Sequence, residues 1–128
     1  MAEPFILRKA LKHLEKGRVV IFACGTGNPY FTTDTGAALR AAQIKADALL
    51  MAKNIDGVYD SDPRKNPDAT KLEHIAYMDV MNQKLSVMDF TSITMCMENN
   101  LPIVAFGLDE ENSIVRAAMG EKIGTVID

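Results

Sequence analysis

Three short apolar runs constrain the fold of this chain most strongly, because no polar side chain interrupts them. They cover Val19 to Cys24, Ala48 to Ala52 and Ile103 to Phe106. Strands of a parallel sheet are covered on both faces and show such continuous runs, whereas half-exposed strands alternate between apolar and polar residues. The three runs therefore predict three buried strands.

Helical patterns alternate with these runs along the chain. Residues 4–16 form the first expected helix, with Pro4 in its first turn and Gly17 at its end. The remaining expected elements are helices at 34–44, 77–84, 89–98 and from Asn112 or Ser113 to near Gly120, and short strands at 72–76 and 125–127. The alternation predicts an α/β fold: a three-layer αβα sandwich with a mainly parallel sheet.

The length of 128 residues fits a single domain, 1–128. A net charge of −3 gives no strong electrostatic footprint for nucleic acid or for an anionic membrane. No apolar stretch approaches transmembrane length, and the N-terminus lacks the order of a signal peptide. Cys24 and Cys96 both lie in apolar surroundings without metal-ligand spacing. We expect two buried, reduced thiols in a cytoplasmic protein.

The loop from Gly25 to Asp34 follows the first predicted strand and precedes a predicted helix. Ligands of open parallel sheets bind on such loops, where the free amides of the helix N-terminus attract anions. Two glycines allow close backbone approach, and Tyr30 and Phe31 offer flat apolar surface for a ring. The hydrogen-bonding side chains are Thr26, Asn28, Thr32 and Thr33. This mixture favours a nucleoside ligand; the alternative is a polar connection capped by Thr33 or Asp34.

Two better-known nucleotide signatures do not fit this loop. A Walker A loop requires a lysine after its glycines, and none follows here. A dinucleotide fingerprint requires a third glycine where Tyr30 stands, and an acidic residue at the end of the next strand, where Lys53 stands. Neither a P-loop nor a Rossmann domain is therefore favoured.

A second loop, from Lys53 to Pro63, follows the second predicted strand. Asp-Gly at 56–57 marks a tight turn, Tyr59 is suited to stack on a base, and Asp62 to accept hydrogen bonds from ribose or base. The order of its aspartates does not fit an EF-hand. From the residues alone, a nucleotide site and an acidic, solvated turn remain equal alternatives.

Four titratable residues complete the candidates. Asp34 and Asp89 stand at predicted helix N-termini, where a carboxylate caps the helix or orients a cation or phosphates. For Asp89, capping is the expected role by residue type. His13 and His74 have no metal-spaced partner, so we expect them to be structural or surface residues, and the sequence predicts no protein metal site.

The sequence of the first loop, Gly25-Thr26-Gly27-Asn28-Pro29-Tyr30-Phe31-Thr32-Thr33-Asp34, closely resembles the G-T-G-N-P-[YF]-F-T-T-D signature of bacterial uridylate kinases, which belong to the amino acid kinase superfamily. Further segments resemble the same family in the same order, so that the resemblance covers essentially all of the chain. These are Asp56 to Tyr59, Asp62-Pro63, Val87 to Asp89 and Met119 to Thr125. The resemblance implies the C-terminal, ATP-binding half of such a kinase.

The resemblance also implies roles for individual residues in transferring the γ-phosphoryl group of ATP to UMP, giving UDP. UMP would contact Thr26, Gly27, Asn28, Pro29, Tyr30, Phe31, Thr32 and Thr33. ATP would contact Tyr59, Asp62 and either Lys53 or Asn54, since one residue of the family pattern is missing before Asp56. Asp34 and Asp89 would lie near the transferred group, and Mg²⁺ would be held chiefly by the ATP phosphates.

Members of this family are about twice as long, and the phosphate loop, second Gly-Gly turn and UMP-binding Arg and Asp of their N-terminal half do not occur here. We therefore expect weak nucleotide binding and little or no turnover by this chain alone. The alternatives are a non-catalytic nucleotide-binding module on the same fold and a superfamily kinase acting on a carboxylate or carbamate.

The resemblance also concerns partners. In the family, the strand at Val19 to Cys24 lies within a sheet shared with the N-terminal half, so one of its edges would be bare here. A bare apolar edge invites pairing with another chain. We expect the partner to be the missing half or another copy of the chain, as a dimer, a swapped assembly or an aggregate; full-length family members are typically hexamers.

Overall fold

A computed structural model describes residues 2–85 and 87–128. Its helices are α1 (Leu7–Glu15), α2 (Thr33–Ile44), α3 (Tyr77–Asn82), α4 (Phe90–Glu98) and α5 (Ser113–Ala118). Its strands are β1 (Leu49–Lys53), β2 (Val58–Tyr59), β3 (Lys71–Leu72), β4 (His74–Ile75), β5 (Ile103–Gly107) and β6 (Thr125–Ile127). The predicted α/β class is confirmed, with several boundaries moved by one or two residues.

The main sheet has the strand order β1-β5-β6-β4. β1 is parallel to β5, as their continuous apolar runs predict, and β4 is parallel to β6. β5 and β6 are antiparallel, which makes the sheet mainly rather than wholly parallel. Gly124 allows β6 to approach β5 closely: its φ is +71°, and an added Cβ would lie 2.0 Å from the carbonyl oxygen of Ala105.

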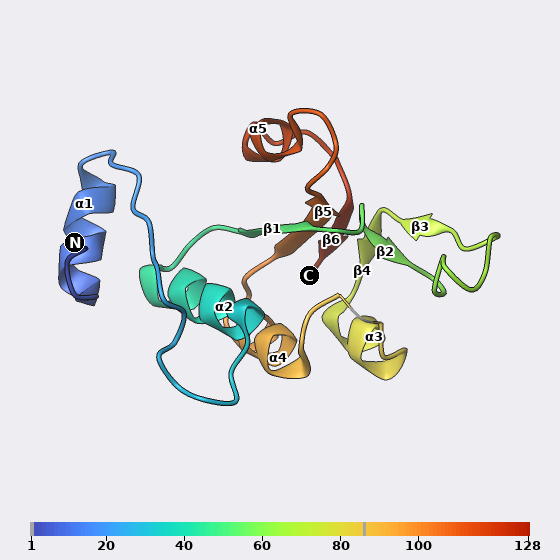
Figure 1. Cartoon of the computed structure of the whole chain (residues 1–128), viewed down its shortest axis with the longest axis horizontal. Helices are drawn as coiled ribbons and strands as arrows, with labels where there is room; N and C mark the ends of the chain where they lie inside the picture. The colour runs from blue at the N-terminus through green and yellow to red at the C-terminus, as the bar shows by residue number, and fades with distance from the viewer. Residues whose placement is uncertain (1, 86) are drawn as a thin grey trace.

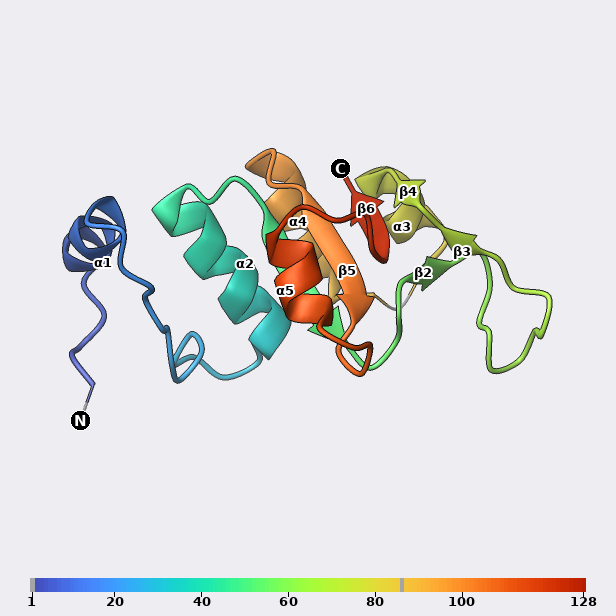
Figure 2. The same ribbon diagram turned by 90° about the horizontal axis from the view of Figure 1, so that it is seen from above.

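The helices cover the sheet in layers (Figures 1 and 2). α2, α4 and α3 lie on one face, and α5 lies on the other. The larger core cluster lies between the sheet and the helices α2, α3 and α4. In this cluster, Ile103 and Ile127 are fully buried against Ile93 of α4. A smaller cluster under α5 contains Phe106 and Ala117. Each large apolar side chain buried in this way stabilises the fold by about 1.5–3 kcal/mol.

The strand predicted at Val19 to Cys24 is wrong for this chain. The segment is extended, but it belongs to no sheet among the described residues, and the side chains of Val19 and Ile21 are 93% and 88% exposed. Cys24 is likewise exposed, which corrects its predicted burial, whereas Cys96 is buried as expected. A continuous apolar run forms a strand only where a neighbouring strand accepts its backbone hydrogen bonds. No such neighbour lies beside this segment in the part of the chain that is described.

The first helix begins later than predicted. α1 starts at Leu7, so Pro4 lies outside it instead of in its first turn. The ring of Phe5 packs edge-on against Phe22, with 5.7 Å between ring centroids, and the guanidinium carbon of Arg40 lies 3.7 Å from the centre of the Phe5 ring. These contacts hold the start of the chain against the extended segment and α2 instead of in line with α1.

The region after β1 contains a small hairpin that the sequence did not indicate. β2 and β3 pair antiparallel in a separate sheet, and β4 follows in the main sheet, so the single strand predicted at 72–76 is divided in two. Gly57 is needed at the start of this hairpin, since an added Cβ would lie 2.8 Å from the hydroxyl of Thr125. In the described residues, no helix combines the length and apolar character needed to cross a membrane.

Candidate functional site

The first loop leads from the extended segment into α2, and Thr32 ends it. The Thr32 hydroxyl accepts a hydrogen bond from the backbone amide of Thr35 at 3.2 Å, so Thr32 is the N-cap of α2. The capping role considered for Thr33 or Asp34 is wrong, because both residues lie inside the first helical turn. Because Thr32 is the cap, the Asp34 carboxylate does not cap α2. It lies at the positive end of the helix and is available to pair with another side chain.

The middle of this loop is a tight turn. The backbone amide of Asn28 donates to the Thr26 hydroxyl at 3.1 Å, and the Asn28 side chain donates to the Thr26 carbonyl at 3.3 Å. Tyr30 has a φ of +70° and is fully exposed, while Phe31 is about half exposed. The two rings therefore face solvent, and what they bind stays a prediction.

Asp89 joins this loop to α4. One carboxylate oxygen accepts hydrogen bonds from the hydroxyls of Thr32 and Thr35, and the other accepts from the amide and hydroxyl of Ser92, both at 2.8 Å. Asp89 is the N-cap of α4, as predicted. Desolvation raises the pKa of Asp89, but the hydrogen bonds from Thr32 and Ser92 outweigh it and lower the pKa below its ordinary value of 3.8. The carboxylate therefore clamps the N-termini of α2 and α4 together.

Asp34 forms an ion pair with Lys53. The Lys53 ammonium donates to the carboxylate at 2.7 Å, and the two side chains are 23% and 20% exposed. Lys53 is the last residue of β1, and Asp34 lies in the first turn of α2, so the pair connects the ends of the two candidate loops. The structure thereby brings together Asp34, which was expected near the transferred group, and Lys53, one of the two candidates for the ATP contact.

The second loop contains its own network. Asp56 accepts hydrogen bonds from the Tyr59 hydroxyl at 2.9 Å and from the Lys71 ammonium at 3.1 Å. Desolvation raises the pKa of Asp56, but the bonds from Lys71 and Tyr59 outweigh it and lower the pKa. The same hydrogen bond to Asp56 raises the pKa of Tyr59. This network fixes the tyrosine ring at the edge of the hairpin, close to the end of β1.

The other expected ATP contacts are less constrained. Asp62 accepts a hydrogen bond from the backbone amide of Arg64 at 3.0 Å and lies 3.8 Å from the ammonium of Lys65. Asn54 is exposed, whereas its alternative, Lys53, points to Asp34. The contacts of Asn54, Tyr59 and Asp62 with ATP stay predictions.

Sequence reasoning missed two groups of residues at the site. Thr35 and Ser92 complete the clamp on Asp89. For Ser92 the available signal was its position three residues after the predicted N-cap, whose side chain typically accepts from the backbone amide there. Arg40 was also missed: one of its guanidinium nitrogens lies 3.4 Å from the carbonyl oxygen of Gly25. Nothing in the local sequence indicates that contact.

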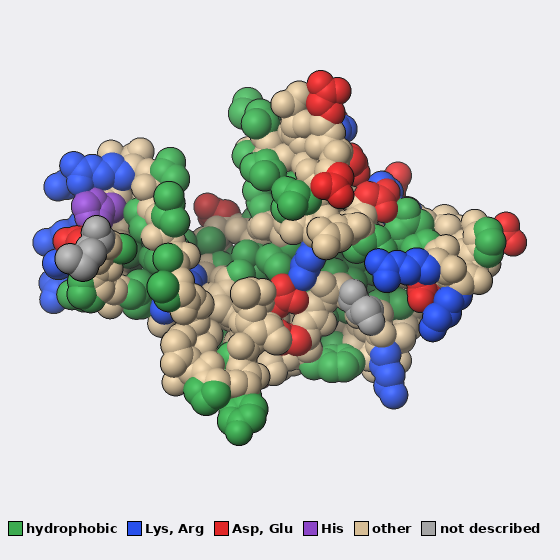
Figure 3. All heavy atoms as spheres, in the orientation of Figure 1, with side chains coloured by type: hydrophobic (Ala, Val, Ile, Leu, Met, Phe, Trp, Pro, Cys, Tyr) green, Lys and Arg blue, Asp and Glu red, His purple; other side chains and the backbone are tan. Residues whose placement is uncertain are grey.

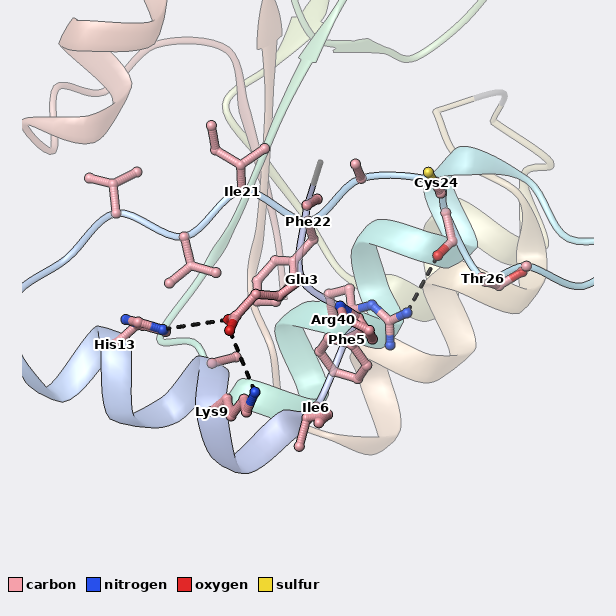
Figure 4. A pocket seen from close by; sticks show the side chains of 18 of the residues that line it. Glu3, Phe5, Ile6, Lys9, His13, Ile21, Phe22, Cys24, Thr26 and Arg40 are labelled. Atoms are coloured by element: carbon pink, nitrogen blue, oxygen red, sulfur yellow. Dashed lines mark hydrogen bonds and ion pairs between the residues drawn. The ribbon is translucent and has the colours of Figure 1, made fainter.

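An open cleft of about 720 Å³ lies beside the first loop (Figure 4). α1 and the residues before it form one side, and the extended segment forms the other, ending at Thr26 and Gly27. Glu3 accepts from Lys9 within the cleft, and His13 points to the same carboxylate. Tyr30 and Phe31 do not line this cleft. In the described part of the chain, no cluster of three His, Cys, Asp or Glu residues is placed to hold a metal ion.

Comparison with known proteins defines the class of this chain. It matches the Amino acid kinase family over residues 3–107 and belongs to that family. It is similar to the UMP kinase from Bacillus anthracis, with 40% identity and a TM-score of 0.94 over 99% of this chain and 52% of that chain. It is also similar to the UMP kinase from Ureaplasma parvum, with 43% identity and a TM-score of 0.89 over 97% of this chain and 53% of that chain.

A third solved kinase is also similar to this chain, with a lower sequence identity. The uridylate kinase from Archaeoglobus fulgidus is 32% identical, with a TM-score of 0.77 over 98% of this chain and 59% of that chain. The predicted resemblance to bacterial uridylate kinases is confirmed. The chain spans little more than half the length of the solved kinases that it matches.

Proposed function

We propose that this chain is the nucleotide-binding half of a UMP kinase, which transfers the γ-phosphoryl group of ATP to UMP and yields UDP. The observation that carries the proposal is the Asp34–Lys53 ion pair, which joins the ends of the two candidate loops. The similarity of 99% of the chain to part of a UMP kinase supports the same reaction.

UMP is assigned to the first loop, at Thr26, Gly27, Asn28, Pro29, Tyr30, Phe31, Thr32 and Thr33. Free amides at the start of α2 and the helix dipole favour its anionic phosphate. The hydroxyl of Thr26 and the amide of Asn28 already bond to each other, which holds this turn in one conformation before a ligand binds. A preformed loop reduces the entropy lost on binding.

ATP is assigned to the second loop, with Tyr59 and Asp62 as contacts and Lys53 or Asn54 as the residue near the end of β1. Mg²⁺ is assigned to the ATP phosphates themselves, because they supply the oxygen ligands that this ion prefers. When bound there, the ion offsets negative charge on the transferred group.

In the transfer step, an ionised oxygen of the UMP phosphate forms a bond to the γ-phosphorus, and the bond from that phosphorus to the bridging oxygen of ADP breaks. Positioning and cationic charge supply most of the catalysis in such reactions. Lys53 brings a positive charge to the meeting point of the loops, and Asp34 holds its ammonium in place. Asp89, whose oxygens are occupied by Thr32, Thr35 and Ser92, positions the start of α2.

Because the chain spans about half of the related kinases, we propose weak nucleotide binding and low turnover when it is alone. Isothermal titration with UMP, CMP, aspartate and glutamate tests the ligand class. We expect UMP to bind, and Asn28→Ala to weaken it about tenfold through lost hydrogen bonds. Asn82→Ala, an exposed asparagine at the end of α3, is the matched control and should leave binding unchanged.

Binding of aspartate or glutamate in preference to UMP would contradict the proposal. A second assay addresses catalysis: UDP formation by the chain together with the complementary half of a UMP kinase, with Lys53→Met expected to abolish it. Binding of UMP and ATP without any UDP formation would instead favour the alternative, a non-catalytic nucleotide-binding module on the same fold.

A further inference from the structure

The hydroxyl of Thr125 bonds to both strands of the hairpin β2–β3. It accepts a hydrogen bond from the backbone amide of Val58 at 2.8 Å and donates one to the backbone carbonyl of Leu72. Val58 and Leu72 face each other in the register of the hairpin, so one side chain of β6 connects an amide of β2 with a carbonyl of β3. Thr125 is fully buried. Valine has nearly the same shape, so the hydrogen bonds, and not the volume, distinguish threonine at this position.

The start of β6 holds this hydroxyl in a fixed place. Thr125 pairs with Ala105 of β5, and the preceding Gly124 approaches the same strand so closely that a side chain does not fit there. β5 pairs in turn with β1, whose last residue is Lys53. The hydroxyl therefore links the hairpin to the part of the main sheet that carries Lys53.

The hairpin carries the tyrosine that the proposed function assigns to ATP. Tyr59 directly follows Val58 and pairs in register with Lys71, and its hydroxyl donates to Asp56. Figure 3 shows basic and acidic side chains side by side over the hairpin on this face, and the Lys71 ammonium lies 3.1 Å from the Asp56 carboxylate. All three residues belong to the hairpin or to the turn before it. Their contacts place the ring on the hairpin, but not the hairpin on the main sheet.

Apolar packing anchors the hairpin without defining its position. Val58 is 2% exposed and belongs to the larger core cluster, and the partly buried Leu72 packs against that cluster. Apolar burial is non-directional, whereas a hydrogen bond requires its donor and acceptor in line at about 3 Å. The hydroxyl is also closely fitted, since a Cβ added at Gly57 would lie 2.8 Å from it. The two bonds of Thr125 therefore define where the hairpin lies.

We propose that Thr125 is a positioning residue, whose hydroxyl fixes the hairpin β2–β3 on the main sheet and thereby places Tyr59 for the adenine nucleotide. This inference rests on the proposed function for the identity of the ligand. Without the hydroxyl, the amide of Val58 and the carbonyl of Leu72 lose a partner inside the protein, and the hairpin must shift to pair them. The shift weakens ATP binding. UMP binding at the first loop is unaffected, because both hydrogen bonds of the hydroxyl go to the hairpin.

Isothermal titration of the full chain with Mg²⁺-ATP and with UMP tests the proposal. Thr125→Val should weaken ATP binding by about tenfold and change UMP binding by about twofold or less. Thr125→Ser keeps the hydroxyl and should restore ATP binding. Tyr77→Phe is the matched control: it removes another buried hydroxyl, which donates to the carbonyl of Leu101 outside the hairpin. It should leave both affinities unchanged although it lowers stability.

Amide hydrogen exchange gives a readout that needs no nucleotide. The amide of Asp60 donates to the carbonyl of Thr70, two residues along the hairpin from Val58. We expect its exchange to become about tenfold faster or more in Thr125→Val and to stay unchanged in Tyr77→Phe. Should Thr125→Val not fold, Gly57→Ala displaces the hydroxyl from the side of the hairpin and should weaken ATP binding in the same selective way.

Unchanged ATP binding in Thr125→Val, or in Gly57→Ala where that variant replaces it, would overturn the inference. Equal losses of ATP and UMP binding would also overturn it, as would a Thr125→Ser variant no better than Thr125→Val or an unchanged exchange rate at Asp60. Failure of the proposed function looks different. Tyr59→Ala would then leave Mg²⁺-ATP binding unchanged, while faster exchange at Asp60 in Thr125→Val would still support the placing of the hairpin by Thr125.

Discussion

Segment 19–24 and strand β5 have almost the same sequence character and opposite surroundings. Both are uninterrupted apolar runs, but β5 lies between β1 and β6 with Ile103 fully buried, whereas Ile21 is 88% exposed. β5 receives backbone partners on both sides from elements of this chain. The comparison shows that an apolar run forms a buried strand only where neighbouring strands supply its backbone partners, as β1 and β6 do for β5.

The largest expected effect separates the two regions by stability. Phe106→Ala should lower the free energy of unfolding by about 3–5 kcal/mol, because it removes a buried ring and leaves a cavity. Ile21→Ala should change it by about 0.5 kcal/mol or less, as for other exposed residues. Urea unfolding followed by circular dichroism measures both. An equal loss from the two variants would mean that segment 19–24 is buried after all.

The next effect concerns the clamp between α2 and α4. Asp89→Ala should cost about 1–2 kcal/mol, since it removes the N-cap of α4 and the acceptor for two threonine hydroxyls. Asp79→Ala, in the first turn of α3, is the matched control, and we expect a change of about 0.5 kcal/mol or less. Thermal unfolding of the three proteins side by side distinguishes these outcomes. A loss as large for Asp79→Ala would show that the clamp adds nothing beyond helix-dipole effects.

Acid should remove part of that stabilisation. The pKa of Asp89 lies below 3.8 in the folded chain, so the unfolded chain binds its proton first as the pH falls. The contribution is therefore complete above about pH 5 and is lost as the pH falls through 3.8 and then through the folded pKa. Unfolding free energies measured from pH 6 to pH 2.5 should decline less steeply for Asp89→Asn than for the unmodified chain. Identical slopes would contradict the lowered pKa.

The smallest expected effect lies where the arm, formed by α1 and the extended segment 19–24, attaches to α2. Arg40→Gln removes the cation–π contact with Phe5, which is worth about 0.5–1 kcal/mol. We expect faster proteolysis at residues 18–24 with little change in global stability. Lys45→Gln, an exposed residue at the other end of α2, should leave the cleavage rate unchanged. No difference between the two variants would mean that other contacts hold the arm.

The sequence predicted those parts of the molecule that a local pattern of residues identifies. The fold class, the positions of β5 and β6 and the capping of α4 by Asp89 are confirmed. The pairing of 19–24 was wrong, because pairing depends on a neighbour that the segment does not contain. The Asp34–Lys53 ion pair joins two elements, and no local pattern reveals that their ends meet.

The same distinction between local pattern and spatial arrangement holds for the residues of the site. The turn at Thr26 to Asn28 depends on local spacing, which the sequence contains, but the cap of α2 was predicted one or two residues too late, at Thr33 or Asp34 instead of Thr32. The choice between Lys53 and Asn54 depended on where each side chain points, and the structure shows that Lys53 contacts Asp34. Which of the two contacts ATP stays a prediction.

Amide hydrogen exchange with added nucleotide tests the central claim most directly. If the two loops form a nucleotide site, millimolar UMP should slow exchange at Gly25 to Asp34, and Mg²⁺ with ATP should slow it at Lys53 to Asp62, with α5 unaffected in both cases. The account would be contradicted if nucleotide saturates its binding to the chain while exchange in both loops stays unchanged.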